Sequence, residues 1–510
     1  MPETLPGDRI FSFPGGLKLK HHKQMACREP VRRPPLPERL YVPLGQHQGE
    51  SGELLVAEGD RVLKGQPLTA SGDDFIVPAH APTSGTVGAV VQHPAAFPPG
   101  GTRRCLVLDP DGEDQWCDPD PLEEWQKRSG VEIIDHLHGA GLAGMGGAMF
   151  PTAAKLRGDW PDLHTVILNG AECEPYIACD EMLMRERPEA IIRGGLILAR
   201  AVGAQRVVIA IEDRMGAVRD KLEAACQQID TDGIVRIVQV LTIYPEGGER
   251  QLIQTLTGKE VPHNGLPQDL GVVCHNVATA ASLRDAVIDG RPLIERIVTV
   301  TGPGIKEPCN LLALIGTPFA HLVEAAGGYQ GKVTRMVLGG PMSGTALASD
   351  EIPVTRGANC LLALTSEQVA STGPVMPCIN CGQCVSACPA GLLPQMLYRH
   401  LEAEQYDRAA ELNLADCIEC GCCAQVCPSH IPLVDFYRHG RQELIRRELD
   451  ERRAALARRR FEAREARMER EKAERAARRK AREEKLKKPD KAQDEIQAAI
   501  ERAKQKRQPK

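Results

Sequence analysis

The chain has 510 residues, of which 42% are hydrophobic, 26% charged and only 4% aromatic, and it carries a formal net charge of −5. This length exceeds what a single hydrophobic core supports, so we expect three or more domains. No run of eighteen apolar residues occurs, which argues against a membrane-spanning helix and leaves only a peripheral role at a membrane. The charge is uneven, because residues 441–510 carry 26 Lys and Arg against 15 Asp and Glu. The body is therefore acidic and the tail basic.

The first two segments differ in character. Residues 1–38 are rich in proline and basic residues and predict an extended arm without a core of its own. Residues 39–118 contain short β-like runs between turn signals. The phrases EGDRVLKGQPL and APTSGTV resemble the half-barrel repeats of biotinyl- and lipoyl-carrier domains, which implies a barrel-sandwich hybrid. Carriers bear a modifiable lysine on the turn between the halves, but here that turn reads TASGDDFIV, so we expect a structural barrel.

Residues 119–287 alternate helix-like and strand-like segments and predict an α/β domain. Gly139, Gly141 and Gly144 match G-x-G-x-x-G, but a helix-like segment precedes them where the dinucleotide fingerprint requires a strand. A Rossmann site is therefore not expected. Five glycines in nine residues, followed by a helix start and Lys155, still form a backbone that a phosphate or ring could approach closely. A flexible hinge is the alternative interpretation.

Three polar loops in the same domain carry a resemblance to a known family. The loops are NGAECEP (169–175), IYPEGGE (243–249) and CHNV (274–277). With the glycine stretch they resemble the flavin-carrying, NADH-binding subunit of respiratory complex I. The resemblance places Gly144, Gly146, Gly147 and Lys155 on the flavin-phosphate and isoalloxazine loop, Phe150 beside the nicotinamide, Asn169 and Glu172 on the flavin, Glu174 on NADH, Tyr244, Gly247 and Glu249 on a second wall, and His275 and Asn276 on the ribityl-phosphate turn.

Three positions depart from the family pattern. Ala171 replaces an Asp, Gly248 replaces one Glu of a pair, and His275 replaces an Asn. These departures bear on the affinity for flavin and on nucleotide preference.

Residues 288–365 follow the order strand, Gly-Pro turn, strand, helix, strand. This order suggests a β-grasp module similar to the soluble-ligand-binding module beside the flavin domain of the same family. The segment GGPMSG (339–344) is a candidate backbone contact near a cofactor, with a plain turn as the alternative.

Residues 366–436 contain two identical runs spaced C-x-x-C-x-x-C-x-x-x-C-P, at 378–389 and 417–428. This is the two-cluster bacterial ferredoxin pattern, in which the fourth cysteine of each run ligates the other 4Fe–4S cluster. One cluster is therefore assigned to Cys378, Cys381, Cys384 and Cys427, and the other to Cys388, Cys417, Cys420 and Cys423. Disulfides would need an oxidising compartment, and zinc sites use two C-x-x-C pairs with longer gaps, so neither fits as well.

The tail, residues 437–510, is charged and helix-forming. Residues 441–488 contain no Gly or Pro, so one helix could extend about 70 Å. We expect a solvated helix that frays past Pro489, with electrostatic docking to an anionic lipid or an acidic partner as the alternative.

These segments together form an electron route. An iron–sulfur cluster passes one electron at a time, whereas a nicotinamide gives two as a hydride, and a flavin can separate the pair. The expected fold class is a multidomain α/β plus β chain: barrel-sandwich hybrid, complex-I-like flavin domain, β-grasp module, two-cluster ferredoxin domain and long charged helix. No nucleophile arrangement typical of hydrolysis or acyl transfer competes with this interpretation.

This domain order resembles the C subunits of the Rnf ion-translocating electron-transport complexes. The resemblance implies an oxidoreductase (translocase) component that lies peripherally on the cytoplasmic side of the bacterial inner membrane. It would exchange hydride with NADH through non-covalent FMN and pass electrons through two 4Fe–4S clusters to other subunits, including a ferredoxin-like iron–sulfur subunit. The complex would couple this transfer to Na⁺ or H⁺ movement. No nucleic-acid partner is expected.

Two alternatives remain open at this stage. Cobalamin reductases of diol-utilisation microcompartments share this plan but are shorter at the C-terminus, so the charged tail favours the Rnf interpretation. A non-enzymatic iron–sulfur scaffold, with a flavin site decayed through Ala171, Gly248 and His275, is the other.

Overall fold

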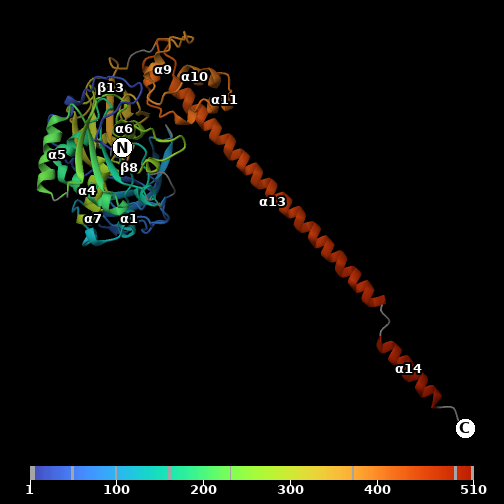
Figure 1. Cartoon of the computed structure of the whole chain (residues 1–510). Coiled ribbons are helices and arrows are strands. Elements are labelled where there is room, and N and C mark those ends of the chain that lie inside the picture. Colours follow the sequence, from blue (N-terminus) through green and yellow to red (C-terminus); the bar gives the residue numbers. More distant parts are fainter. Residues whose placement is uncertain are drawn as a thin grey trace. The chain divides into compact units, whose positions relative to one another are not determined.

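A computed structural model of the chain describes residues 6–46, 51–97, 100–158, 160, 162–229, 231, 233–369, 373–487 and 491–506 (Figure 1). The chain divides into two compact units, Met1–Tyr437 and Arg438–Lys510. The first unit contains three sheets and a small helical domain. Within the described ranges, no helix combines the length and the apolar character that crossing a membrane requires.

The first sheet is antiparallel and has the order β1-β4-β3-β2. Its strands are β1 (Leu40–Pro43), β2 (Arg61–Val62), β3 (Gly85–Pro94) and β4 (Thr102–Pro110). Leu40, Val62 and Leu108 are fully buried and belong to one apolar cluster inside this domain. The predicted barrel-sandwich architecture is confirmed, although only two residues of the run EGDRVLKGQPL form a regular strand.

The second sheet is parallel and has the order β7-β6-β5-β8. Its strands are nearly continuous apolar runs because helices cover both faces. Alternate residues of β5 show this directly: Val166 and Leu168 pack into the cluster on one face, and Ile167 packs into the cluster on the other. The strands are β5 (Thr165–Gly170), β6 (Arg206–Glu212), β7 (Val235–Val240) and β8 (Val272–Asn276).

The helices of this domain divide between those two faces. Residues from α1, α4, α5 and α7 join the larger cluster, and residues from α6 join the smaller one. Helix α1 precedes the glycine stretch, so the expectation of a helix and not a strand at this point is confirmed. The helices are α1 (Gly130–Gly139), α2 (Thr152–Leu156), α3 (Cys179–Glu186), α4 (Pro188–Val202), α5 (Gly216–Gln228), α6 (Glu249–Thr257) and α7 (Val277–Asp289).

The third sheet has the order β10-β9-β13-β11-β12, and helix α8 (Phe319–Ala325) packs against it through Phe319 and Leu322. Its strands are β9 (Glu295–Thr301), β10 (Cys309–Leu314), β11 (Val333–Leu338), β12 (Thr345–Leu347) and β13 (Cys360–Thr365). The predicted sequence of strand, turn, strand, helix and strand is confirmed.

The cysteine-rich segment forms a small domain from α9 (Gln383–Ala387), α10 (Pro394–Glu402), α11 (Tyr406–Glu411) and α12 (Cys422–Gln425). Its two cysteine loops have matching backbones. Asn380 and Glu419 each adopt a left-handed conformation one residue before a cysteine, and a left-handed glycine follows that cysteine in both loops. Gly382 and Gly421 supply this second position at little steric cost.

The tail is helical for most of its length. Helix α13 (Leu433–Lys487) is one unbroken helix in Figure 1 and begins before Gly440, and α14 (Lys491–Gln505) follows it. The predicted charged helix is confirmed, but the prediction that order ends past Pro489 is wrong. The residues after it are good helix formers that can begin a new helix once the proline has ended the first.

The packing of α4 against α7 gives a stability prediction. A methyl group on Gly194 would lie 1.9 Å from the backbone oxygen of Ala280. We expect Gly194→Ala to force these helices apart and lower the free energy of unfolding by about 1–3 kcal/mol, measured by urea unfolding. Gly216→Ala at the start of α5 is the matched control, since no atom lies within 4 Å of its added methyl group. Equal midpoints for the two variants would contradict the packing argument.

Candidate functional site

The loops singled out in the sequence meet at the carboxyl ends of β5 and β8. The chain runs outward from β5 to β6 and β7 on one side, while β8 pairs with β5 on the other. Asn169 and Asn276 lie near the ends of these two strands and are paired in parallel register. Such a reversal of strand order opens a crevice outside the strand ends, where α/β proteins bind ligands.

The glycine stretch forms a closed loop over this crevice. The backbone N–H of Gly144 donates to the oxygen of Phe150 at 2.8 Å, and that of Met145 donates to the Thr279 hydroxyl at 3.0 Å. A side chain on Gly147 would meet no atom within 4 Å, and one on Gly146 would meet only Asn276 at 3.8 Å. The loop therefore leaves its backbone open to a ligand.

Lys155 and His275 line the base of the same site. The Lys155 amine donates at 2.6 Å both to Glu249 and to the carbonyl of Cys274. Burial, together with the positive charge of Lys155, holds the pKa of His275 well below its usual value, so its imidazole is neutral. Its Nε2 is buried and has no hydrogen-bond partner among the described residues. A lysine cation, an unpartnered imidazole and open glycine backbone suit a ligand that carries a phosphate and polar ring atoms.

Glu172 is held at the start of α3. Its carboxylate accepts from the backbone N–H of Asp180 at 3.0 Å and from that of Glu181 at 3.4 Å. Lys23 of the N-terminal arm lies 3.4 Å from the carboxylate and also donates to the Glu172 backbone carbonyl. Both side chains are 5% exposed or less. The carboxylate is therefore fixed by a helix N-terminus and a buried cation.

Glu174 is held by a different domain. The backbone N–H groups of Met342 and Ser343 donate to it at 2.6 and 3.1 Å, and the Ser343 hydroxyl donates at 3.0 Å. Burial raises the pKa of Glu174, and these hydrogen bonds oppose the shift. Gly340 has to lack a side chain, because a Cβ there would lie 2.0 Å from Glu174 Cγ. The segment 339–344 is thus a loop that contacts the site residue directly.

The turn after β7 faces both the crevice and the cysteine-rich domain. Gly247 accepts from the Asn169 side chain at 2.9 Å, and a Cβ on it would lie 2.2 Å from the Ala171 oxygen. The buried Tyr244 hydroxyl donates to the backbone oxygen of Cys420 at 2.7 Å. Of the predicted residues, Phe150 lies apart from this turn and packs edge-on against Phe75 of the barrel at 5.8 Å.

The eight assigned cysteines surround two small cavities. Cys378, Cys381, Cys384 and Cys427 line one, and Cys388, Cys417, Cys420 and Cys423 line the other. Each cavity thus receives three cysteines of one run and the last cysteine of the other run. Cys422 lines neither of these cavities and packs with Cys173, Tyr244 and Ala387. Four thiol groups around a closed, apolar hollow are the donor set that an iron–sulfur cluster requires.

Comparison with family models assigns each part of the chain. Residues 11–113 match the RnfC barrel-sandwich hybrid domain, and residues 137–285 match the Nuo51 FMN-binding domain. Residues 297–346 match the SLBB domain, and residues 377–431 match the 4Fe–4S dicluster domain.

Whole-chain relatives share one name, the C subunit of the ion-translocating oxidoreductase complex. A protein of Pectobacterium carotovorum is 45% identical over 98% of this chain and 66% of its own length. One from Pectobacterium atrosepticum is 44% identical over 98% of this chain and 71% of its own. The chain belongs to this family of C subunits. It spans only 58% of the length of a third relative, from Erwinia tasmaniensis, at 44% identity over 92% of this chain.

Solved structures resemble this chain more distantly. A NAD⁺-reducing [NiFe]-hydrogenase in its H₂-reduced state aligns over 62% of this chain and 65% of its own, with 18% identity and a TM-score of 0.42.

Sequence reasoning missed three contributors to this site. Lys23 lies 149 residues before Glu172, in a segment that shows only proline and basic composition. Met342 and Ser343 were included in a candidate turn, but nothing in the sequence pairs that turn with Glu174. Each pairing is formed by long-range folding, so no local spacing could predict it.

The buried Lys23–Glu172 pair gives the second prediction. Lys23→Met would leave a buried carboxylate without its cation, which costs about 3–5 kcal/mol. We expect a lower unfolding midpoint and reduced retention of FMN on gel filtration. Lys20→Met on the exposed part of the arm is the control and should match the unmodified chain. If both variants kept FMN and stability equally, the role assigned to Lys23 would be wrong.

Proposed function

We propose that this chain is the electron-input component of a membrane-associated, ion-translocating NADH–ferredoxin oxidoreductase. It exchanges hydride with NADH through one non-covalent FMN and passes single electrons through two 4Fe–4S clusters to other subunits, which include a ferredoxin-like protein. The complex couples this transfer to Na⁺ or H⁺ movement at the cytoplasmic face of the inner membrane. The observation that supports this most directly is the contact between Tyr244 in the flavin loops and Cys420 in the cysteine-rich domain.

The flavin domain's own residues suit this task. A bound FMN takes two electrons as a hydride and returns them one at a time. The open backbone at Gly146 and Gly147 lets a planar ring lie close to the loop, and Lys155 supplies positive charge at the base of the crevice. Glu174 is buried and held by three hydrogen bonds, so its carboxylate is fixed in place before any nucleotide binds.

The cysteine-rich domain docks with one particular cavity toward the flavin loops. Tyr244 contacts Cys420, and a side chain on Gly421 would lie 3.1 Å from the Met342 oxygen, in the loop that holds Glu174. Cys420 belongs to the set with Cys388, Cys417 and Cys423. The cluster held by this set therefore receives electrons from the flavin, and the cluster held by Cys378 and its partners passes them outward.

The cofactor content tests this proposal. Protein purified without oxygen should contain one FMN and about eight Fe per chain, and NADH should reduce both chromophores. Glu174→Gln should raise the NADH concentration needed for half-maximal flavin reduction and leave the iron content unchanged. Protein that lacks flavin, or whose flavin NADH does not reduce, would favour the non-enzymatic scaffold.

Paired substitutions test the crossed ligation. Cys378→Ala with Cys427→Ala removes two ligands from one set, so about four Fe should remain. Cys378→Ala with Cys388→Ala removes one ligand from each set and should lose both clusters. Cys226→Ala, outside both cavities, is the control. Loss of both clusters in the first pair, measured as iron, sulfide and EPR signals, would contradict the assignment.

A further inference from the structure

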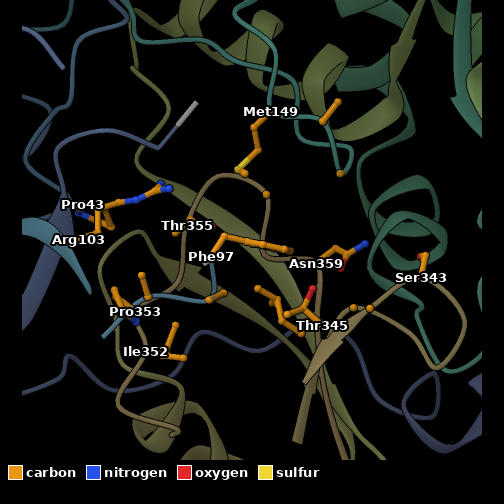
Figure 2. Close-up of a pocket in the computed structure, with 18 of the residues that line it drawn as sticks. Pro43, Phe97, Arg103, Met149, Ser343, Thr345, Ile352, Pro353, Thr355 and Asn359 are labelled. Atoms are coloured by element: carbon orange, nitrogen blue, oxygen red, sulfur yellow. The ribbon is translucent and has the colours of Figure 1, made fainter. Parts of the chain in front are cut away.

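A large cavity next to the flavin loops lies between three domains. It has a volume of about 550 Å³, which is the size of a small-molecule site. Gly147 and Glu174 line it from the flavin domain, Phe97 and Arg103 from the barrel, and Thr355 and Asn359 from the β-grasp module. None of these barrel and β-grasp residues was assigned a role from the sequence. Figure 2 shows Phe97 in the middle of this space, between Thr355 and Asn359.

Buried bonds between domains keep the walls of this cavity in place. Arg356, 1% exposed, donates to the backbone oxygen of Pro78 in the barrel at 2.6 Å. His93 of the barrel contacts the Glu351 oxygen at 2.8 Å. Ser343 ties the β-grasp loop to Glu174 on the other side. The cavity is therefore formed before a ligand enters, which lowers the entropy cost of binding.

The charges in the cavity lie at opposite sides. Among the described residues that line it, only Arg103 and Glu174 are charged. Glu174 is hydrogen-bonded to Ser343, and Figure 2 shows Ser343 and Arg103 on opposite sides of the space. The Arg103 guanidinium donates to the Gly45 carbonyl and has no carboxylate partner within the described part of the chain. It is thus available to an anion, and a guanidinium suits phosphate oxygens.

The remaining walls suit a nucleoside. Phe97 is 53% exposed and presents a ring face on which a base can stack. Within the described chain, the side chains of Thr355 and Asn359 make no hydrogen bond, so they can pair with ribose hydroxyls. Gly147 connects this space to the open glycine loop. An aromatic face, a cation and hydroxyl partners thus line one space that reaches the flavin loop.

We propose that this cavity binds the adenosine diphosphate half of the nicotinamide dinucleotide, with Arg103 on the phosphates and Phe97 against the adenine. The inference rests on the proposed function, since it names the part of NADH that each wall recognises. The nicotinamide end then lies at Gly147, beside the flavin. On this view the barrel and the β-grasp module contribute to nucleotide selection as well as to structure.

Direct binding of ADP-ribose tests this site without any electron transfer. ADP-ribose is the dinucleotide without its nicotinamide ring, and titration calorimetry on the FMN-loaded, cluster-containing protein should detect it. Arg103→Ala should weaken the binding about tenfold or more, because a charge-assisted hydrogen bond is lost. Phe97→Ala, at an exposed position after β3, provides a second variant that does not depend on the first one folding. Arg104→Ala is the matched control, since neighbouring side chains on a strand point to opposite faces.

The same variants should change nucleotide selection. Unmodified protein should reduce its flavin at lower concentrations of NADH than of reduced nicotinamide mononucleotide, which lacks the adenosine half. Arg103→Ala should reduce that preference about tenfold or more, while Arg104→Ala should keep it. If unmodified protein does not bind ADP-ribose, or if Arg103→Ala and Phe97→Ala bind it as tightly as Arg104→Ala, the inference is overturned. Failure of NADH to reduce the flavin while ADP-ribose binding depends on Arg103 would instead overturn the proposed function alone.

Discussion

The parallel pairing of β5 with β8 is the constraint on which the flavin site depends. It places Asn169 and Asn276 at the same level, at the point where the strand order reverses. Every loop of the site leaves the sheet near this point or closes over it. Because the strands are buried on both faces, their register is fixed by packing and not by the loops themselves. The loops can therefore carry glycines and polar residues without loss of position.

The loops themselves are stabilised from outside the flavin domain. Lys23 comes from the arm, Ser343 from the β-grasp module, and Cys420 from the cysteine-rich domain. Buried carboxylates such as Glu172 and Glu174 would be costly without these partners. The site is thus complete only when all parts of the first compact unit have assembled. This explains physically why an arm without its own core has a fixed course.

The cysteine ligands were the part of the site most open to prediction. Their spacing is local, and a C-x-x-C turn allows few backbone conformations, so the sequence alone predicted both sets of four. The helix after Pro489 was missed for the opposite reason. A proline ends one helix, but whether the next residues begin another depends on their own propensity, and the residues from Lys491 onward are good helix formers.

By itself the sequence determined the order of domains, the two cysteine sets and the identity of the flavin loops, because these depend on short spacings and local turn chemistry. Only the tertiary structure decided which residues the loops contact. Lys23 beside Glu172, Ser343 on Glu174, and the cavity between Arg103 and Gly147 join segments that are far apart in the chain. Such contacts arise from how domains pack against one another, and no periodicity or spacing within one segment encodes them.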